Sequence, residues 1–267
     1  MDGESQSESH SYGQFGEDQI LYEIFGDRAD GYCVEIGAYD GRSGSASYAF
    51  EQRGWQCLLV EPIPEFVEEI RKHRACAVVN CAVSDKEGVA TFGVAEGVEA
   101  MSTLDLSPDH LEWIERAGGA VKQINVRTAT LDKLLAEVGF PEIQFITIDV
   151  EGHELGVLEG FTLEAHKPRI VILEDNSIGG DSRVARYMSD HGYVHFRRTG
   201  VNEWYAHGSD VELVQPEEIR RFERAKARQL WERRRKHLAN RIATWGGRHL
   251  PAPTKRHLRS LYDRVRS

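Results

Sequence analysis

Short continuous apolar runs alternate with stretches of helical spacing through most of this sequence. Strands buried on both faces appear as continuous apolar runs, and parallel strands need helical crossovers between them. The alternation therefore predicts an α/β domain whose mostly parallel sheet carries helices on both faces. The predicted strands are 32–37, 56–62, 76–83, 143–150 and 168–175, and an antiparallel hairpin, 192–198 and 202–207, completes seven. The predicted helices are 45–53, 64–73, 130–138, 153–160 and 182–191, after a loop and short helix within 13–26.

An insertion interrupts the alternation after the third predicted strand. It contains two strand-like runs, 89–95 and 121–127, with a loop through 101–104 and a short helix at 108–117 between them. Insertions at the carboxyl edge of such a sheet are common places for ligand recognition. We therefore expect this segment to recognise a substrate.

Charge divides the chain into two parts. The sequence has 33 basic and 43 acidic residues, yet residues 220–267 contain 16 basic and only 3 acidic ones. We place a domain boundary near Pro216, which gives a disordered N-terminus at 1–11, a globular domain at 12–214 and a basic extension at 215–267. Because the globular part is strongly acidic, it would repel phosphates, and we expect no nucleic-acid partner.

The basic extension is expected to be helical. Residues 221–245 are rich in helix formers and contain neither glycine nor proline, and a second basic segment follows at 254–267. Tryptophan and leucine gather on one face of the predicted helix, opposite lysine and arginine, a pattern typical of peripheral attachment to an anionic membrane. Docking onto the acidic domain or onto a partner protein are the alternatives.

Cysteine usage and hydropathy favour a cytoplasmic protein. Cys33, Cys57, Cys76 and Cys81 lie in or beside apolar runs without a CxxC pair, which predicts reduced thiols rather than disulfides or a zinc site. No apolar run reaches the roughly 20 residues of a membrane span. The first residues also lack the apolar segment of a secretory signal.

Motifs at the ends of the first two strands indicate a nucleoside-type ligand. The run VEIGAYDG (34–41) places Glu35, Gly37, Asp40 and Gly41 around a tight turn, where glycine lets the backbone approach a ligand. The absence of GxGxxG argues against a dinucleotide oxidoreductase, whereas the acidic position suits the cationic S-adenosylmethionine (SAM). Glu61 ends the second strand, where a carboxylate accepts both ribose hydroxyls; a solvated glutamate is the alternative.

The segment NCAVSD (80–85) reaches the same edge of the sheet. Asn80, Ala82, Ser84 and Asp85 are predicted to line an adenine pocket, in which Asp85 accepts a hydrogen bond from the exocyclic amine. A plain Ser/Asp turn is the alternative.

The run ITIDVEGHELGVLEGF (146–161) carries the most specific pattern. It resembles the IDVEGxExxVLxG motif of the FkbM-type methyltransferase family. GQFGEDQIL, VEIGAYDG, LLVEP and NCAVSD upstream, and TATLDKLL, PRIVILE and NEWYAH downstream, resemble the family in the same order.

This resemblance covers residues 12–207. It implies a Rossmann-like class I SAM-dependent methyltransferase that O-methylates sugars or polyketide-type natural products. The SAM-site residues that it implies are Glu35, Gly37, Asp40, Gly41 and Glu61, with Gln14, Glu17 and Asp18 closing over the cofactor.

Methyl transfer to a hydroxyl needs a base or a metal that acidifies the acceptor. Asp149, Glu151 and His153 are the candidate bases, since the fourth strand delivers them to the reaction edge. Asp149 with Asp175 and Asn176 is similar to the metal set of catechol-type O-methyltransferases, which predicts Mg²⁺ or Mn²⁺. One alternative is that these groups only hydrogen-bond loops and SAM. Another follows from the resemblance: the FkbM strand usually ends in glutamate, which Glu174 matches, so that the Asp-Asn after it is incidental.

We expect the acceptor to be a small molecule, a glycan or a lipid-linked glycan at the cytoplasmic face of a membrane. The competing function is a catalytically silent nucleoside-binding scaffold that presents the basic extension to a partner.

Overall fold

The computed structural model describes residues 11–176, 182–215, 217–222, 224–225 and 228. The chain divides into two units, Met1–Gln215 and Pro216–Ser267, and the first contains the fold described below. Residues 1–10 of the predicted disordered segment 1–11 lie outside the described residues, as do most of the predicted helix 221–245 and all of 254–267. Among the described residues, no helix is long and apolar enough to cross a membrane.

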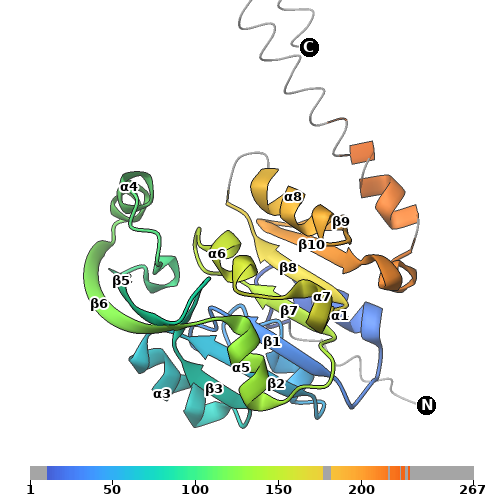
Figure 1. Cartoon of the computed structure of the whole chain (residues 1–267), viewed down its shortest axis with the longest axis horizontal. Coiled ribbons are helices and arrows are strands. Elements are labelled where there is room, and N and C mark those ends of the chain that lie inside the picture. The colour runs from blue at the N-terminus through green and yellow to red at the C-terminus, as the bar shows by residue number, and fades with distance from the viewer. Residues whose placement is uncertain (1–10, 177–181, 216, 223, 226–227, 229–267) are drawn as a thin grey trace, which may run out of the picture. The chain divides into compact units, whose positions relative to one another are not determined.

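Seven strands form one sheet in the order β3-β2-β1-β7-β8-β10-β9 (Figure 1). Pairs within the β3-to-β8 part are parallel, whereas β10 runs antiparallel to both β8 and β9. The strand order reverses between β1 and β7, which creates the crevice where open α/β sheets bind ligands. The predicted Rossmann-like, mostly parallel seven-stranded sheet is therefore confirmed. The strands are β1 (Tyr32–Ile36), β2 (Gln56–Glu61), β3 (Ala77–Asn80), β7 (Phe145–Ile148), β8 (Ile170–Glu174), β9 (Tyr193–Thr199) and β10 (Asn202–His207).

Helices cover both faces of this sheet because successive strand residues point to opposite sides. On one face, α5 (Leu131–Val138), α6 (Glu154–Glu159) and α8 (Ser182–Asp190) join a large apolar cluster with the strands. On the other face, α1 (Glu17–Phe25) and α2 (Tyr48–Glu51) pack aromatic rings around Phe145. The remaining helical elements are α3 (Pro64–His73), α7 (Leu163–His166) and η2 (Gly208–Leu213), of which α7 and η2 were not predicted.

One predicted strand was wrong. The run 76–83 forms two strands, because the Asn80 side chain donates to the backbone carbonyls of Glu61 and Pro62 and the chain then leaves the main sheet. The residues that follow, β4 (Ala82–Val83), pair instead with β6 (Ala120–Ala129). Helix α2 is also shorter than predicted, since the side chains of Ser45 and Ser47 bond to Glu35 ahead of it.

The insertion forms a second, three-stranded sheet in the order β4-β6-β5. Its long antiparallel pair is β5 (Gly88–Glu96) with β6, and η1 (Glu99–Met101) and α4 (Pro108–Arg116) lie between them in the chain. Figure 1 shows β5 and β6 curving away from the main sheet with α4 beyond their ends. The four cysteines are free thiols, as predicted.

Candidate active site

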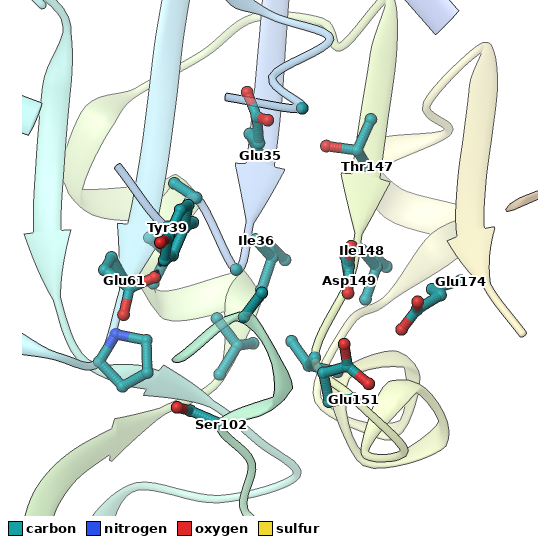
Figure 2. Close-up of a pocket in the computed structure, with 18 of the residues that line it drawn as sticks. Glu35, Ile36, Tyr39, Glu61, Ser102, Thr147, Ile148, Asp149, Glu151 and Glu174 are labelled. Atoms are coloured by element: carbon teal, nitrogen blue, oxygen red, sulfur yellow. Dashed lines mark hydrogen bonds between the residues drawn. The ribbon is translucent and has the colours of Figure 1, made fainter. Parts of the chain in front are cut away.

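A cavity of about 360 Å³ opens at the carboxyl ends of the main-sheet strands, within the roughly 300–1,000 Å³ range of small-molecule sites. Figure 2 shows two groups of side chains facing it. We call Gly37, Ala38, Tyr39 and Glu61 the β1–β2 half, and Asp149, Glu151, His153 and Glu174 the β7–β8 half. The other lining residues used below are Gln14, Glu17, Glu35, Ile63, Phe66, Ala82, Phe92, Glu99, Ser102 and Leu104.

The β1–β2 half is built on a turn that only glycine allows. Gly37 has a φ of 81°, and a Cβ there would clash with the backbone carbonyl oxygen of Asp149. Tyr39 follows with a φ of 50°, in the left-handed region that non-glycine residues enter at a cost. The chain thus brings the turn after β1 against the end of β7 and leaves the backbone open to a ligand.

Glu61 is fixed at the edge of this half. Its Oε2 accepts from the Tyr39 N–H at 2.9 Å and its Oε1 from the Ile63 N–H at 2.8 Å. The side chain is 4% exposed, and burial raises its pKa to about 8 although both N–H groups oppose that shift. A carboxylate has about four lone-pair sites, so both oxygens retain acceptor capacity toward a ligand.

Glu35, Asp40 and Gly41 support the turn after β1 in different ways. Glu35 lines the cavity, but its Oε2 accepts from the hydroxyls of Ser45 and Ser47. Asp40 accepts from the backbone and side chain of Ser43, and neither Asp40 nor Gly41 is among the lining residues. Asp40 and Gly41 therefore lie outside the cavity, whereas Glu35 is at its wall.

Only part of the predicted adenine pocket faces the cavity. Ala82 lines it, together with the apolar side chains of Ile63, Phe66 and Phe92. Asn80 and Asp85 are exposed and are not among the lining residues. Asn80 holds the carbonyls that follow β2, which is a role the sequence pattern did not reveal.

The N-terminal segment closes one side of the cavity through Gln14 and Glu17. Glu17 Oε1 accepts from Thr199 Oγ1 at 2.9 Å and from Asn202 Nδ2 at 3.0 Å, which ties this segment to the β9–β10 hairpin. Asp18 does not line the cavity; it accepts from the backbone N–H groups of Tyr12 and Gly13.

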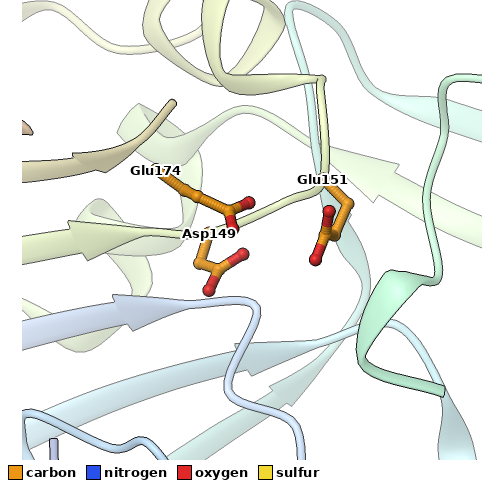
Figure 3. A group of neighbouring side chains, drawn as sticks. All are labelled: Asp149, Glu151 and Glu174. Carbon is orange, nitrogen blue, oxygen red and sulfur yellow. The ribbon is translucent and has the colours of Figure 1, made fainter. Parts of the chain in front are cut away.

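Three carboxyl groups converge in the β7–β8 half. Asp149, Glu151 and Glu174 each offer an oxygen, and these atoms lie within 4.8 Å of one another (Figure 3). Burial raises the pKa of all three carboxyls, and the mutual repulsion of Asp149, Glu151 and Glu174 raises those of Glu151 and Glu174 further. Glu151 also has a φ of 52°, the kind of strain that gathers at functional sites.

The predicted metal set of Asp149, Asp175 and Asn176 differs from this grouping. Among the described residues, Glu174 from the last position of β8 joins Asp149, and Asp175 is not part of the cluster. The Asn176 amide instead lies 3.4 Å from Glu151 Oε2. Three carboxylate oxygens this close fit the ligand type that Mg²⁺ or Mn²⁺ prefers.

His153 lines the cavity beside these acids, with its Nε2 3.0 Å from Ser84 Oγ. Burial lowers the pKa of its imidazole, while Asp85, Asp105 and Glu159 oppose that shift. The ring is therefore neutral near pH 7, the form in which histidine accepts a proton.

The insertion forms one wall of the cavity. From the sequence we expected it to recognise a substrate but did not name the residues involved. Glu99, Ser102 and Leu104 line the cavity, and the fully buried Thr103 donates from Oγ1 to the carbonyl oxygen of Glu151 at 2.8 Å. A backbone bridge between Gly93 and Thr103 holds this loop to β5. The loop MSTL (101–104) could have indicated these residues, because loops inside insertions often contact ligands.

The strand order, the glycine turn and the strand-end acids together are typical of the class I fold of SAM-dependent methyltransferases. The sequence matches the Methyltransferase FkbM domain family over residues 35–195, and the chain belongs to that family. Among curated proteins no match was found.

Solved structures with a similar fold include three methyltransferases. The FkbM methyltransferase from Methylobacillus flagellatus KT has a TM-score of 0.45 and 14% identity over 67% of this chain and 44% of its own, so the match spans less than half of that protein. TrmK from M. capricolum, solved with S-adenosyl-homocysteine, has a TM-score of 0.40 and 11% identity over 96% of both chains. Precorrin-6y C5,15-methyltransferase from Geobacter metallireducens GS-15 has a TM-score of 0.39 and 12% identity over 76% of this chain and 95% of its own.

Proposed function

We propose that this protein transfers a methyl group from SAM to a sugar hydroxyl of a glycan, a glycolipid or a natural product. The observation that carries the proposal is the set of acidic groups that line the cavity. Its lining includes seven acidic side chains and, among the described residues, neither lysine nor arginine. The acids are Glu17, Glu35, Glu61, Glu99, Asp149, Glu151 and Glu174.

A cavity lined by acidic groups favours cationic and neutral ligands over anionic ones. SAM carries a sulfonium and an ammonium, and both are favoured beside carboxylates. A phosphorylated acceptor or a nucleic-acid backbone would be repelled, because its anionic groups meet no lysine or arginine partner here. A neutral polyol fits best, since carboxyl groups hydrogen-bond hydroxyls readily.

The residues divide the work of the reaction. Glu61 would hold the ribose hydroxyls of the cofactor, and the turn at Gly37 would let the backbone approach it. When bound, SAM supplies an electrophilic methyl group. Asp149, Glu151 and Glu174 orient the acceptor hydroxyl, and this positioning accounts for much of the acceleration in such displacements. His153, neutral near pH 7, is available to take the hydroxyl proton.

The proposal is tested with labelled SAM and matched acceptors. We expect methyl transfer to neutral glycosides and at least tenfold less to the same sugars bearing a phosphate, which is about 1.4 kcal/mol of discrimination. A preference for the phosphorylated sugars would contradict the neutral-acceptor assignment. Tight S-adenosylhomocysteine binding without transfer to any acceptor would support the silent-scaffold alternative instead.

A divalent cation is the second route to an activated hydroxyl. Asp149, Glu151 and Glu174 would hold Mg²⁺ or Mn²⁺, which would lower the pKa of a bound hydroxyl. If the metal is used, EDTA abolishes turnover, Mg²⁺ or Mn²⁺ restores it, and folded Asp149→Asn is inactive. Full activity in EDTA would leave the base-only mechanism.

We further propose that the basic extension attaches the enzyme to an anionic membrane face, where a lipid-linked glycan would be its acceptor. The excess of basic residues after position 219 supports this. The expected result is co-sedimentation with anionic but not neutral vesicles, weakened by salt and lost on deletion of 216–267. Protein that stays in the supernatant with anionic vesicles at low salt would contradict it.

A further inference from the structure

Helix α4 of the insertion carries an exposed aromatic side chain outside the cavity. Trp113 is 40% exposed, and among the described residues the other exposed large apolar side chains are Phe15 and Val89. The ring of Phe15 lies directly on Gly200, where a Cβ would clash with it, and Val89 is aliphatic. Ile114, the next residue, is fully buried, so α4 packs through one side and presents the indole on another. Trp113 is therefore an accessible aromatic surface in the segment expected to recognise the acceptor.

His110 joins this indole to the wall that the insertion forms. The two rings lie edge to face, with centroids 5.3 Å apart and an interplanar angle of 81°. The same imidazole has its Nε2 3.3 Å from the backbone carbonyl oxygen of Met101. Met101 lies in the stretch between Glu99 and Ser102, both of which line the cavity. The imidazole therefore connects Trp113 to the cavity wall.

The other nitrogen of His110 faces the end of β7. A Cβ on Gly152 would lie 3.9 Å from His110 Nδ1. Gly152 stands between Glu151 and His153, and both of these residues line the cavity. His110 thus bridges the insertion and the β7–β8 half at the rim of the cavity, and the indole packs against it without lining the cavity itself.

A chain of hydrogen bonds fixes α4 relative to the acids. Thr103 Oγ1, which donates to the Glu151 carbonyl oxygen, also accepts from the Asp105 N–H at 2.8 Å. Asp105 Oδ1 in turn accepts from the Ser107 N–H at 3.0 Å. Ser107 is the N-cap of α4, and its Oγ accepts from the His110 N–H at 3.4 Å. The start of the helix that carries the indole is therefore linked to the carbonyl of Glu151.

The exposed charges on α4 narrow the choice of ligand. Asp109, Glu112 and Glu115 are exposed, and Arg116 is paired with Glu112 at 2.7 Å. An anionic membrane or a phosphorylated group would therefore be repelled by this helix. A neutral sugar ring fits, because its C–H groups pack on an aromatic face while its hydroxyls donate to carboxylates at the edge.

We propose that Trp113 forms a second sugar subsite, so that the acceptor is a saccharide of two or more units. The reacting unit lies in the cavity, and the next unit crosses the rim at His110 and stacks on the indole. This inference rests on the proposed O-methylation and adds the length of its acceptor. Because Trp113 lies outside the cavity, it contributes to acceptor binding and not to the chemical step.

Calorimetry on the whole chain with S-adenosylhomocysteine bound tests the subsite directly. The probes are the methyl glycosides of glucose, galactose and mannose, and the disaccharides cellobiose, lactose and mannobiose. We expect at least one disaccharide to bind about fivefold more tightly than its monosaccharide unit. Trp113→Ala should remove this advantage and leave monosaccharide affinity unchanged, whereas Trp113→Tyr should keep most of it. A wild type with no preference for any of the disaccharides would overturn the inference.

Val89→Ala is the matched control. Val89 is 74% exposed on β5 of the same insertion and is not among the lining residues. Its loss should leave the affinities for both kinds of probe unchanged. A fall in disaccharide preference equal to that of Trp113→Ala would show that the effect is not specific to the indole, and would refute the subsite.

Turnover with labelled SAM separates the subsite from the proposed reaction. Trp113→Ala should raise the KM for a disaccharide acceptor about fivefold, with kcat and the KM for SAM unchanged. Equal losses on monosaccharide and disaccharide acceptors would indicate a structural role and refute the subsite. Disaccharide binding that depends on Trp113 but leads to no methyl transfer would support the subsite and contradict the proposed reaction.

Two other partners of the indole are recognised in the same samples. Sedimentation velocity measures self-association, and flotation with anionic vesicles measures membrane contact. Both properties should be the same in the wild type and in Trp113→Ala. A Trp113→Ala protein that loses either one and keeps the wild-type disaccharide preference would overturn the sugar subsite.

Discussion

The β1–β2 and β7–β8 halves of the cavity lie at the same edge of the main sheet but are built differently. In the β1–β2 half, Gly37, Tyr39 and Glu61 act largely through backbone geometry and N–H groups between residues 37 and 63. In the β7–β8 half, side chains from separate strands are forced together, and Glu151 and Glu174 come from different elements. A backbone-built site is fixed by a local motif, whereas a site built from converging acids depends on the whole fold.

Gly37→Ala should distort both halves of the cavity and should have the largest effect on ligand binding and stability. The added Cβ would clash with the Asp149 carbonyl oxygen, which joins the two halves. We expect S-adenosylhomocysteine binding by calorimetry to fall at least a hundredfold and the melting temperature to drop. Gly97→Ala is the matched control, because its φ of 88° is similar but no atom lies within 4 Å of its Cβ. Equal behaviour of the two variants would show that the close approach is unimportant.

Glu61→Ala and Glu151→Gln should separate the halves. If Glu61 holds the ribose as proposed, Glu61→Ala removes two charge-assisted hydrogen bonds and should weaken S-adenosylhomocysteine binding by about 1.5–3 kcal/mol. Glu151→Gln should leave that affinity within about twofold, since a change under ~0.5 kcal/mol is typical away from direct contacts, and should reduce kcat instead. Calorimetry and single-turnover kinetics on both variants check the pattern. A Glu151→Gln protein that binds the product as weakly as Glu61→Ala would contradict this division.

The smallest expected effect is on stability as pH rises. Burial raises the pKa of Glu61 to about 8 and that of Glu154 to about 7, and it also raises those of Glu151 and Glu174. A group whose pKa is higher in the folded than in the unfolded protein binds more protons when folded. Its contribution to the free energy of unfolding is complete below the pKa that the group has in the unfolded protein. That contribution is lost as pH rises through the pKa of the folded protein.

The ligand-free protein should therefore melt at a lower temperature at pH 9 than at pH 5. A loss of about 1 kcal/mol corresponds to about 2–4 °C in a domain of this size. Scanning calorimetry from pH 5 to 9 measures it. Glu174→Gln should flatten the dependence because one raised carboxyl is gone. A melting temperature that rises across this window would contradict the buried-acid description.

Sequence patterns predicted those strands whose formation depends on the residues within the strand itself. Continuous apolar runs gave the main-sheet strands to within two residues, apart from the run 76–83, because a buried parallel strand needs apolar side chains on both faces. The split at Asn80 was missed, since its cause is a side-chain contact with the end of β2. The pairing of β4 with β6 could not be predicted either, because a strand of two residues is too short to show a recognisable pattern.

The predicted site residues show the same contrast. Gly37, Glu61, Asp149, Glu151 and His153 line the cavity, because strand ends deliver them there. Glu174 instead of Asp175 joins the acid cluster, since only the register of β8 decides which of two adjacent side chains faces inward.

Thr103 limits how an enzyme of this type can acquire new substrates. Its hydroxyl donates to the carbonyl of the strained Glu151, and its backbone pairs with Gly93, so this buried residue links the insertion to the end of β7. Loop grafts that keep this anchor can vary the sequence on either side, through η1 and α4, without disturbing the acids. Grafts that replace it would release Glu151 from its left-handed backbone. Directed evolution of acceptor preference should therefore tolerate changes around Thr103 far better than changes at Thr103 itself.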